Sequence, residues 1–200
     1  QVDDQMILNI EAAPIANAGP DQEICVSNYT ITTATAQNYH HIQWTSSGSS
    51  GTLVNANTIT PTYIHSTLDI ANGSVVLTLT ASANFPCSVD AVDQMTIIIR
   101  ETTVVSAGQD VTICEGSVFT PSDASATNYA SIQWTTSGTG SFINANTINP
   151  TYTPSPADIA LGWVNLTLTA TSNAPCTQVV SDAMRLTFVR QPIVDAGPNV

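Results

Sequence analysis

The sequence predicts an all-β protein made of tandem β-sandwich modules. The first observation is an internal repeat: residues 61–81, PTYIHSTLDIANGSVVLTLTA, recur as residues 150–170, PTYTPSPADIALGWVNLTLTA. The second is a pattern of short segments in which apolar and polar residues alternate, separated by Gly, Pro and Asn. Because alternation with a period of two buries one face of a sheet, evenly spaced segments of this kind indicate two packed sheets.

The repeat has a period of 89 residues and sets the expected domain boundaries. Cys25 recurs as Cys114, and Asp93-Gln94-Met95 recurs as Asp182-Ala183-Met184. Asp4-Gln5-Met6 matches the same motif, so the first residues resemble the end of a repeat. We therefore expect a linear array of modules. It consists of the last strand of a preceding repeat (1–14), repeat 1 (15–103), repeat 2 (104–192) and the start of a following repeat (193–200).

The first half of each repeat is expected to hold several short strands. A strand is predicted around Tyr29 to Ala36, with its counterpart at Phe119 to Ala126. The next strand contains Ile42-Gln43-Trp44-Thr45, in which Ile and Trp share one face. A Ser- and Gly-rich turn then leads to strands near Leu53 and Tyr63.

The second half of each repeat has the clearest alternation. Val75, Leu77, Leu79 and Ala81 share one face of a strand, as Val164, Leu166, Leu168 and Ala170 do in repeat 2. The final strand has a similar apolar face. Its expected core positions are Met95, Ile97 and Ile99 in repeat 1, Met184, Leu186 and Phe188 in repeat 2, and Met6, Leu8 and Ile10 in the first segment.

Each repeat contains two cysteines that are 62 positions apart, Cys25 with Cys87 and Cys114 with Cys176. Neither pair has the CxxC spacing of a zinc or redox site. We expect a disulfide within each repeat, which would stabilise it by roughly 4 kcal/mol and would indicate an oxidising, extracytoplasmic compartment. The alternative is two free, buried thiols in each repeat.

Trp44 and Trp134 lie between the cysteines, in the Cys…Trp…Cys order of immunoglobulin-like sandwiches, so burial in the core is expected. Sugar stacking is the alternative role. The segments that begin at Asp69 and Asp158 each predict a one-turn helix with an Asp N-cap and a Gly stop.

Recurring acidic residues make the domain junctions candidate binding sites for calcium. Calcium binds six to eight oxygens and favours acidic loops, although the chain has no D-x-D-x-D run. No other cofactor is expected. The candidate calcium ligands are Asp21, Asp69, Asp93, Asp110, Asp158 and Asp182.

No catalytic constellation is evident in the sequence. His40, His41 and His65 correspond to Ala130, Ser131 and Pro154 in repeat 2, and no nucleophile elbow, zinc motif or phosphate loop occurs. We therefore expect that the protein is not an enzyme. Trp163 corresponds to Ser74 of repeat 1, so it has no shared structural purpose and is a candidate ligand-binding residue.

The balance of acidic and basic residues limits the partners that the chain can bind. Three basic and fifteen acidic residues give a formal net charge of −12, which opposes binding to nucleic acid or anionic lipid. No stretch reaches the roughly 20 apolar residues of a membrane span, so membrane insertion is not expected.

Several motifs together resemble a known family. The run Ala16 to Cys25 (ANAGPDQEIC), the turn after Trp134 (TTSGTG), the segment Asn149 to Ser155 and the strand from Leu166 (LTLTA) look like PKD-like, immunoglobulin-related repeats. Such repeats occur in giant secreted proteins of the Bacteroidota. The turn after the Trp strand departs from ordinary PKD domains, which have Trp-x-Phe-Gly-Asp-Gly there, and this indicates a subfamily.

The resemblance implies export, through the type IX route, and display in long arrays on the bacterial surface, in adhesins that include those of gliding motility. The leading expectation is a non-catalytic stalk or filament segment whose partners are the neighbouring repeats. The alternatives are a module that binds polysaccharide or a cell-surface protein, and a non-catalytic accessory region of a secreted enzyme.

Overall fold

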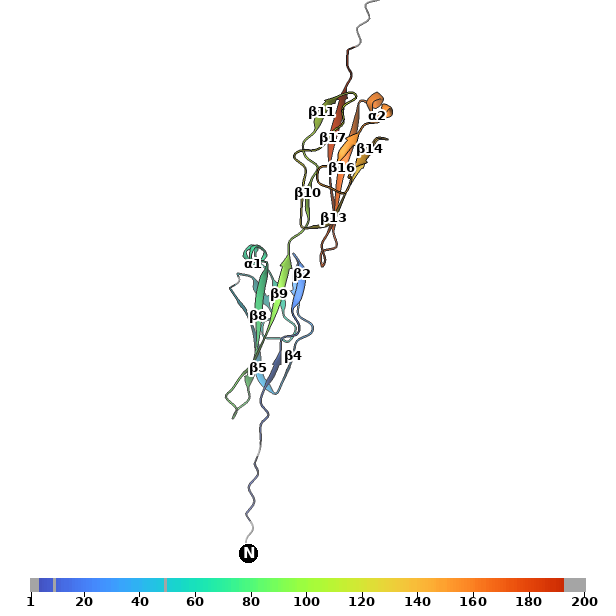
Figure 1. The fold of residues 1–200 in the computed structure, drawn as a ribbon. Coiled ribbons are helices and arrows are strands. Elements are labelled where there is room, and N and C mark those ends of the chain that lie inside the picture. The colour runs from blue at the N-terminus through green and yellow to red at the C-terminus, as the bar shows by residue number, and fades with distance from the viewer. Residues whose placement is uncertain (1–3, 9, 49, 193–200) are drawn as a thin grey trace, which may run out of the picture. The chain divides into compact units, whose positions relative to one another are not determined.

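A computed structural model describes residues 4–8, 10–48 and 50–192 of the chain (Figure 1). It divides into two compact units, Gln1–Glu101 and Thr102–Val200. Strands dominate both units, and the described residues contain two helices of six residues each. The predicted all-β class is therefore confirmed.

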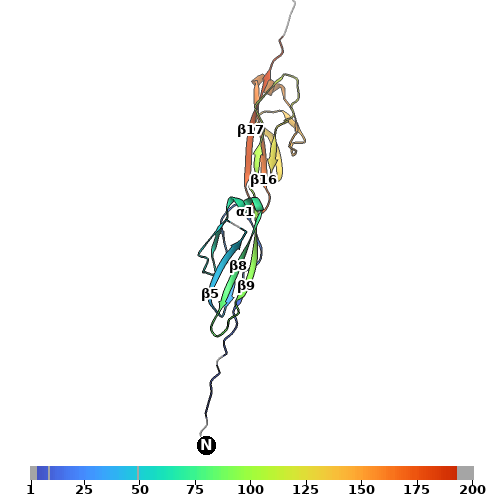
Figure 2. The ribbon, with the colours of Figure 1, turned by 90° about the vertical axis from the view of Figure 1, so that its left-hand side faces the viewer.

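Unit 1 is a β-sandwich. Its larger sheet has the order β2-β9-β8-β5, in which β2 and β9 are parallel, and β5, β8 and β9 lie side by side in Figure 2. The facing sheet has the order β3-β7-β6, and β1 pairs with β4. The elements are β1 (Ile15–Asn17), β2 (Gln22–Cys25), β3 (Tyr29–Thr30), β4 (Thr35–Gln37), β5 (Tyr39–Ser47), β6 (Thr52–Val54), β7 (Thr62–Ile64), α1 (Thr67–Asn72), β8 (Ser74–Ala83) and β9 (Ala91–Arg100).

Unit 2 has the same architecture. Its larger sheet has the order β11-β17-β16-β13, and the smaller pairs are β14-β15 and β10-β12. A single bridge between Phe119 and Tyr152 takes the place of the β3–β7 pairing. The elements are β10 (Val104–Ser106), β11 (Val111–Cys114), β12 (Ser125–Thr127), β13 (Tyr129–Thr136), β14 (Ser141–Ile143), β15 (Thr151–Thr153), α2 (Pro156–Leu161), β16 (Trp163–Ser172) and β17 (Val179–Val189).

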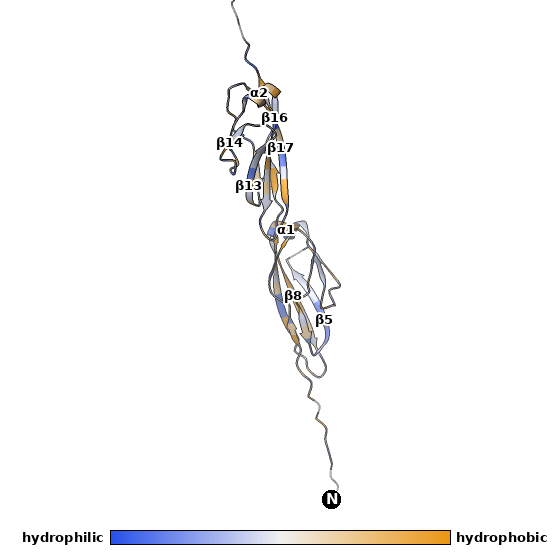
Figure 3. Cartoon of the chain, turned by 90° about the vertical axis from the view of Figure 1, so that its right-hand side faces the viewer, coloured by the Kyte–Doolittle hydropathy of each residue, from blue (hydrophilic) through white to orange (hydrophobic). Residues whose placement is uncertain are grey.

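The predicted alternation is confirmed on the long strands. Along β8, every second residue from Val75 to Ala81 is at most 3% exposed, and the same holds from Val164 to Ala170 on β16. Figure 3 shows hydrophobic and hydrophilic residues interspersed along the strands. Because side chains of successive strand residues point to opposite faces, this pattern fills the space between the two sheets of each unit.

The single strand expected from Tyr29 to Ala36 is divided in the structure. β3 pairs with β7 in the sheet β3-β7-β6, whereas β4 pairs with β1 in a separate two-stranded sheet. The residues between them include Ile31 and Ala34, which are 0% and 8% exposed. Two inward side chains three positions apart do not fit one regular strand, so the chain crosses between sheets here.

The tryptophans expected in the core are buried. Trp44 and Trp134 are each 1% exposed. The Nε1–H of Trp134 donates to the Thr147 carbonyl at 3.2 Å, whereas Nε1 of Trp44 has no hydrogen-bond partner. The two repeats therefore share the burial of this tryptophan, but only the indole of repeat 2 forms a hydrogen bond.

Residues expected to form the last strand of a preceding repeat lie outside the sandwich. Met6, Leu8 and Ile10, expected at core positions, are 89%, 74% and 85% exposed. No strand is assigned among residues 4–8 and 10–14. No preceding repeat is among the residues that the structure describes, so the assignment of residues 1–14 to its last strand stays a prediction. Residues 193–200, expected to begin a following repeat, lie outside the described residues.

Candidate functional site

A buried Tyr–Asp pair is the most developed polar cluster in each unit. In unit 2, Tyr152 of β15 is 0% exposed and Asp158 of α2 is 2% exposed. The Tyr152 hydroxyl donates to Asp158 Oδ2 at 2.9 Å. In unit 1, Tyr63 donates to Asp69 Oδ2 at 2.7 Å. The pair therefore recurs with the repeat and joins the short helix to the sheet. We call these pairs, Tyr63–Asp69 and Tyr152–Asp158, the Tyr–Asp clasp.

The helix begins one turn earlier than the sequence indicated. Ser155, not Asp158, is the N-cap of α2: its hydroxyl accepts from Asp158 N, and Asp158 Oδ2 accepts from Ser155 N at 2.8 Å. Ser66 and Asp69 form the same capping box in α1. The predicted Asp N-caps are therefore wrong, because the aspartate at the third helical position satisfies the backbone of the true cap.

The predicted glycine stops are confirmed. Gly73 and Gly162 end α1 and α2 with φ angles of 73° and 90°. This left-handed conformation is one that only glycine adopts without a steric penalty from Cβ.

The surroundings of Asp158 and Tyr152 shift both of their pKa values. Burial by itself would raise the pKa of Asp158, but hydrogen bonds from the N–H groups of Ser155 and Thr139 and from nearby hydroxyls outweigh it and lower this pKa. Burial, together with the neighbouring Asp158 charge, raises the pKa of Tyr152 to about 12. Near neutral pH the Asp158 carboxylate is thus ionised and the Tyr152 phenol is neutral. These two states suit a structural hydrogen bond between the two side chains.

The other candidate calcium ligands accept backbone hydrogen bonds within their own unit. Asp93 Oδ2 accepts from Ala18 N at 2.7 Å, and Asp21 Oδ1 accepts from Thr96 N at 2.7 Å. Asp182 and Asp110 make the equivalent bonds to Ala107 N and Arg185 N at 2.8 Å each. These recurring aspartates therefore fasten the opening segment of each repeat to its final strand.

No metal centre is formed by the described part of the chain, in which no three His, Cys, Asp or Glu side chains are placed to hold a metal ion. Asp69 and Asp158 are enclosed by their hydroxyl and backbone donors. Calcium at the junctions stays a prediction.

The cysteines differ from the expected pattern. Cys87 and Cys114 have free thiols, whereas Cys25 and Cys176 are disulfide-bonded. The bonds expected within each repeat, Cys25 with Cys87 and Cys114 with Cys176, are therefore not formed. The physical reason is that the length of one strand separates the two cysteines of a repeat. In unit 1, Cys25 lies opposite Arg100 at the end of β9, whereas Cys87 lies in the loop before β9 begins.

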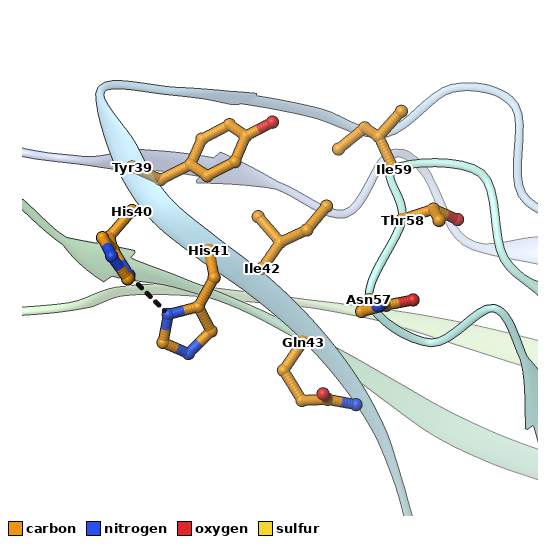
Figure 4. A pocket seen from close by; sticks show the side chains of 8 residues that line it. All are labelled: Tyr39, His40, His41, Ile42, Gln43, Asn57, Thr58 and Ile59. Carbon is orange, nitrogen blue, oxygen red and sulfur yellow. Dashed lines mark hydrogen bonds between the residues drawn. The ribbon is translucent and has the colours of Figure 1, made fainter.

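Unit 1 has an open hollow of about 490 Å³ beside the start of β5. It is lined by Tyr39, His40, His41, Ile42, Gln43, Asn57, Thr58 and Ile59 (Figure 4). Nδ1 of His40 lies 3.1 Å from Nδ1 of His41, and Nε2 of His41 lies 3.2 Å from the Ser82 hydroxyl. Repeat 2 has Ala130 and Ser131 at the histidine positions, so these imidazoles belong to one repeat only.

Trp163 is half-buried at the start of β16, as its sequence position suggested. The Arg185 guanidinium carbon lies 4.3 Å from the centroid of the Trp163 ring. Cation–π contact therefore occupies one face of this ring. Its role as a ligand-binding residue stays a prediction.

Sequence reasoning missed the Tyr–Asp clasp, although a signal was available. Tyr63 and Tyr152 each precede an aspartate by six positions, within the stretch that recurs most clearly. Gly51 and Gly140 also belong to this site, since a Cβ on Gly51 would lie 2.7 Å from Asp69 Oδ2 and one on Gly140 would lie 2.6 Å from Tyr152 Cζ. A tyrosine, an aspartate and a glycine that recur together indicate one packed site.

Comparison with known proteins identifies the fold. No protein-family model matches the sequence, and no curated protein matches it either. Among solved structures, human protocadherin-24 EC1-2 matches with a TM-score of 0.52 at 12% identity, over 92% of this chain and 100% of that one. Identity at this level shows the fold alone.

Two longer structures match at similar levels. Drosophila N-cadherin EC1-4 has a TM-score of 0.52 at 13% identity over 90% of this chain, and the Sidekick-1 immunoglobulin domains 1-4 have 0.53 at 15% over 88%. The matched parts are 50% and 49% of those chains, so this chain spans about half their length. The units are thus β-sandwiches of the immunoglobulin-like and cadherin-like type.

No helix among the described residues is long and apolar enough to span a membrane.

Proposed function

We propose that this chain is a non-catalytic structural segment of a long extracellular adhesin, in which each β-sandwich module supplies length and stiffness. The observation that carries the proposal is the distribution of the recurring residues. The two repeats share their most deeply buried residues: Trp44, Tyr63, Asp69 and Leu77 recur as Trp134, Tyr152, Asp158 and Leu166, and all eight are at most 2% exposed. A shared buried core and shared helix caps are what a repeated scaffold requires.

The residues that differ between repeats support the same proposal. His40 and His41 on unit 1 and Trp163 on unit 2 have no counterpart in the other repeat. A site built from them would occur once in the described chain rather than once per module. The tandem domains of protocadherin-24, N-cadherin and Sidekick-1 share the fold, which also supports an arrangement of modules in series.

The proposed location is the bacterial cell surface, and the proposed partners are the neighbouring repeats. Support comes from the resemblance to PKD-like repeats of Bacteroidota surface proteins, which extends to type IX export and gliding adhesins. The formal net charge of −12 opposes a nucleic-acid partner.

The test compares module number with surface chemistry in the parent protein. Deleting one 89-residue repeat should shorten the reach of the surface structure in electron micrographs and weaken cell attachment. Replacing His40, His41 and Trp163 together by Ala should leave both unchanged. The proposal fails if the triple substitution abolishes attachment while the deletion of a repeat has no effect.

Binding of polysaccharide or of a surface protein is the second candidate function. The hollow beside β5 favours it, because Tyr39 is 38% exposed there and neighbouring imidazole and amide groups provide hydrogen-bond donors and acceptors. A glycan array probed with the chain tests this candidate directly. Saturable binding that is lost in the variant Tyr39→Ala would support it, and an array without signal would exclude glycans.

A further inference from the structure

An irregularity in β5 brings two neighbouring imidazoles together. The pairing of β5 with β8 shifts by one residue between Tyr39 and Ile42, so His40 and His41 together lie opposite the single residue Ser82. Successive residues of a regular strand point to opposite faces, whereas a bulge of this kind re-aims a side chain. Figure 4 shows the two rings next to each other, joined by the dashed contact. The backbone therefore presents two adjacent imidazoles at one place.

The two Nδ1 atoms converge. They lie 3.1 Å apart, and the planes of the rings are nearly perpendicular, at 84°. At least one of these nitrogens carries no proton, because two N–H groups cannot donate to each other. Nε2 of His41 lies 3.2 Å from the Ser82 hydroxyl. The tautomer that donates from Nε2 leaves a lone pair on His41 Nδ1, and metal-ligating histidines ordinarily make an outer hydrogen bond of this kind.

The separation of the Nδ1 atoms matches two neighbouring ligand positions of one metal ion. Metal–imidazole bonds are about 2.0–2.1 Å long, so nitrogens 3.1 Å apart subtend an angle of about 98° at the metal. This angle lies between about 90°, for tetragonal Cu²⁺ or Ni²⁺, and about 109°, for tetrahedral Zn²⁺. One ion can therefore bind both nitrogens at their observed separation.

We propose that His40 and His41 chelate one divalent transition-metal ion of the class that binds imidazole, with Cu²⁺ held most tightly. Imidazole suits Cu²⁺, Ni²⁺ and Zn²⁺, and Cu²⁺ has the highest affinity among the divalent first-row ions. Both rings are exposed and line the open hollow beside β5, so an ion can reach them. The proposal depends neither on the stalk function nor on the binding of a glycan.

The composition of the site sets its behaviour. No centre with three His, Cys, Asp or Glu ligands is formed by the described residues, so water completes the coordination and the ion exchanges with solvent. Ca²⁺ takes oxygen ligands and is not expected to bind two imidazoles. The formal net charge of −12 raises the concentration of cations around the chain.

Repeat 2 contains the same bulge without the imidazoles. The pairing of β13 with β16 shifts by one residue between Tyr129 and Ser131. Ala130 and Ser131 occupy the histidine positions, and the Ser131 hydroxyl lies 2.6 Å from that of Thr171, where His41 contacts the facing strand in unit 1. The two repeats therefore share the backbone irregularity and differ in the side chains, which gives a matched control within one chain.

The first experiment titrates the full chain with Cu²⁺ in a calorimeter. The chain carries no polyhistidine tag, and the thiols of Cys87 and Cys114 are alkylated, because thiolates also bind transition metals. His40→Asn and His41→Asn should each weaken binding at least about tenfold, since a single imidazole remains, whereas His65→Asn should leave it unchanged. Zn²⁺ should bind more weakly than Cu²⁺. Equal affinities for Cu²⁺ in all three variants would overturn the proposal.

The second experiment counts the imidazoles and moves the site. Pulsed electron paramagnetic resonance of the native chain should show two imidazole ligands on the bound Cu²⁺, and a single imidazole would overturn the proposal. Ala130→His together with Ser131→His should add a second Cu²⁺ site with the same spectrum, because the bulge in repeat 2 supplies the same geometry. A folded double variant without the second site would refute the role of the bulge in forming the chelate.

Discussion

Replacing Asp158 by Asn tests whether the Tyr–Asp clasp stabilises repeat 2. The carboxylate accepts from Thr139 N at 2.8 Å, Ser155 N at 2.8 Å and the Tyr152 hydroxyl at 2.9 Å. An amide can accept at one oxygen only, so at least one buried donor loses its acceptor, which costs about 1–3 kcal/mol. The remaining bonds change from charge-assisted to neutral ones and lose roughly 0.5–1 kcal/mol each.

The expected total is about 3 kcal/mol in the free energy of unfolding. For a domain of this size, such a loss lowers the melting temperature of repeat 2 by roughly 15 °C. Differential scanning calorimetry of the full chain measures it. Repeat 1 serves as an internal reference, because its clasp at Asp69 is unchanged.

The pH dependence gives the prediction a second readout. Because the folded-state pKa of Asp158 is lowered, its stabilisation is fully present above the unfolded pKa, about 4, and is lost as the pH falls toward the folded value. The difference between the native chain and Asp158→Asn should therefore shrink on acidification below pH 4.

The control variant is Asp4→Asn, which removes the same charge from an exposed position and should change stability by less than about 0.5 kcal/mol. Equal effects of the two substitutions at pH 7 would refute the argument from hydrogen bonds. A difference that stays constant from pH 7 to pH 2 would refute the assignment of the ionised state.

Three further predictions follow from the same contacts. Tyr152→Phe should cost about 1.5–3 kcal/mol in unfolding experiments. Because burial raises the pKa of Tyr152 to about 12, the native chain should also lose stability as the pH rises from 10 to 12, and this loss should be smaller in the variant. Trp134→Phe should destabilise its repeat by about 1 kcal/mol more than Trp44→Phe does in denaturant titrations, since only Trp134 loses an indole hydrogen bond; equal losses would contradict this. Gly162→Ala should cost about 1 kcal/mol through its φ of 90°, with no steric clash, because no atom lies within 4 Å of the added Cβ; an unchanged melting temperature would show that the helix end relaxes.

Much of the core could be predicted because strand periodicity is a local property. The alternation in β8 and β16 appears directly in the order of residues, and the buried side chains follow it. Repetition strengthened the inference, since Trp44 and Trp134 gave the same prediction twice. The helix stops at Gly73 and Gly162 were equally local, because a left-handed residue needs glycine wherever it occurs.

Features that join distant segments could not be predicted in the same way. Asp69 was expected to begin a helix as its N-cap. Its carboxylate instead accepts hydrogen bonds from the Ser66 N–H and from the Tyr63 hydroxyl of the facing sheet. Asp93 and Asp182 were candidates for calcium, but each holds the backbone of a segment 75 residues away. Spacing in the sequence does not reveal which donors meet a carboxylate.

The cysteines show most clearly where the sequence alone was sufficient and where it was not. The sequence determined that there are two per repeat, at matching positions, and that a tryptophan lies between them. Only the tertiary structure decided that Cys25 and Cys87 lie at opposite ends of β9 in one sandwich. The physical reason is that a disulfide depends on the distance between two Cα atoms in space, which the separation of 62 residues along the chain does not determine.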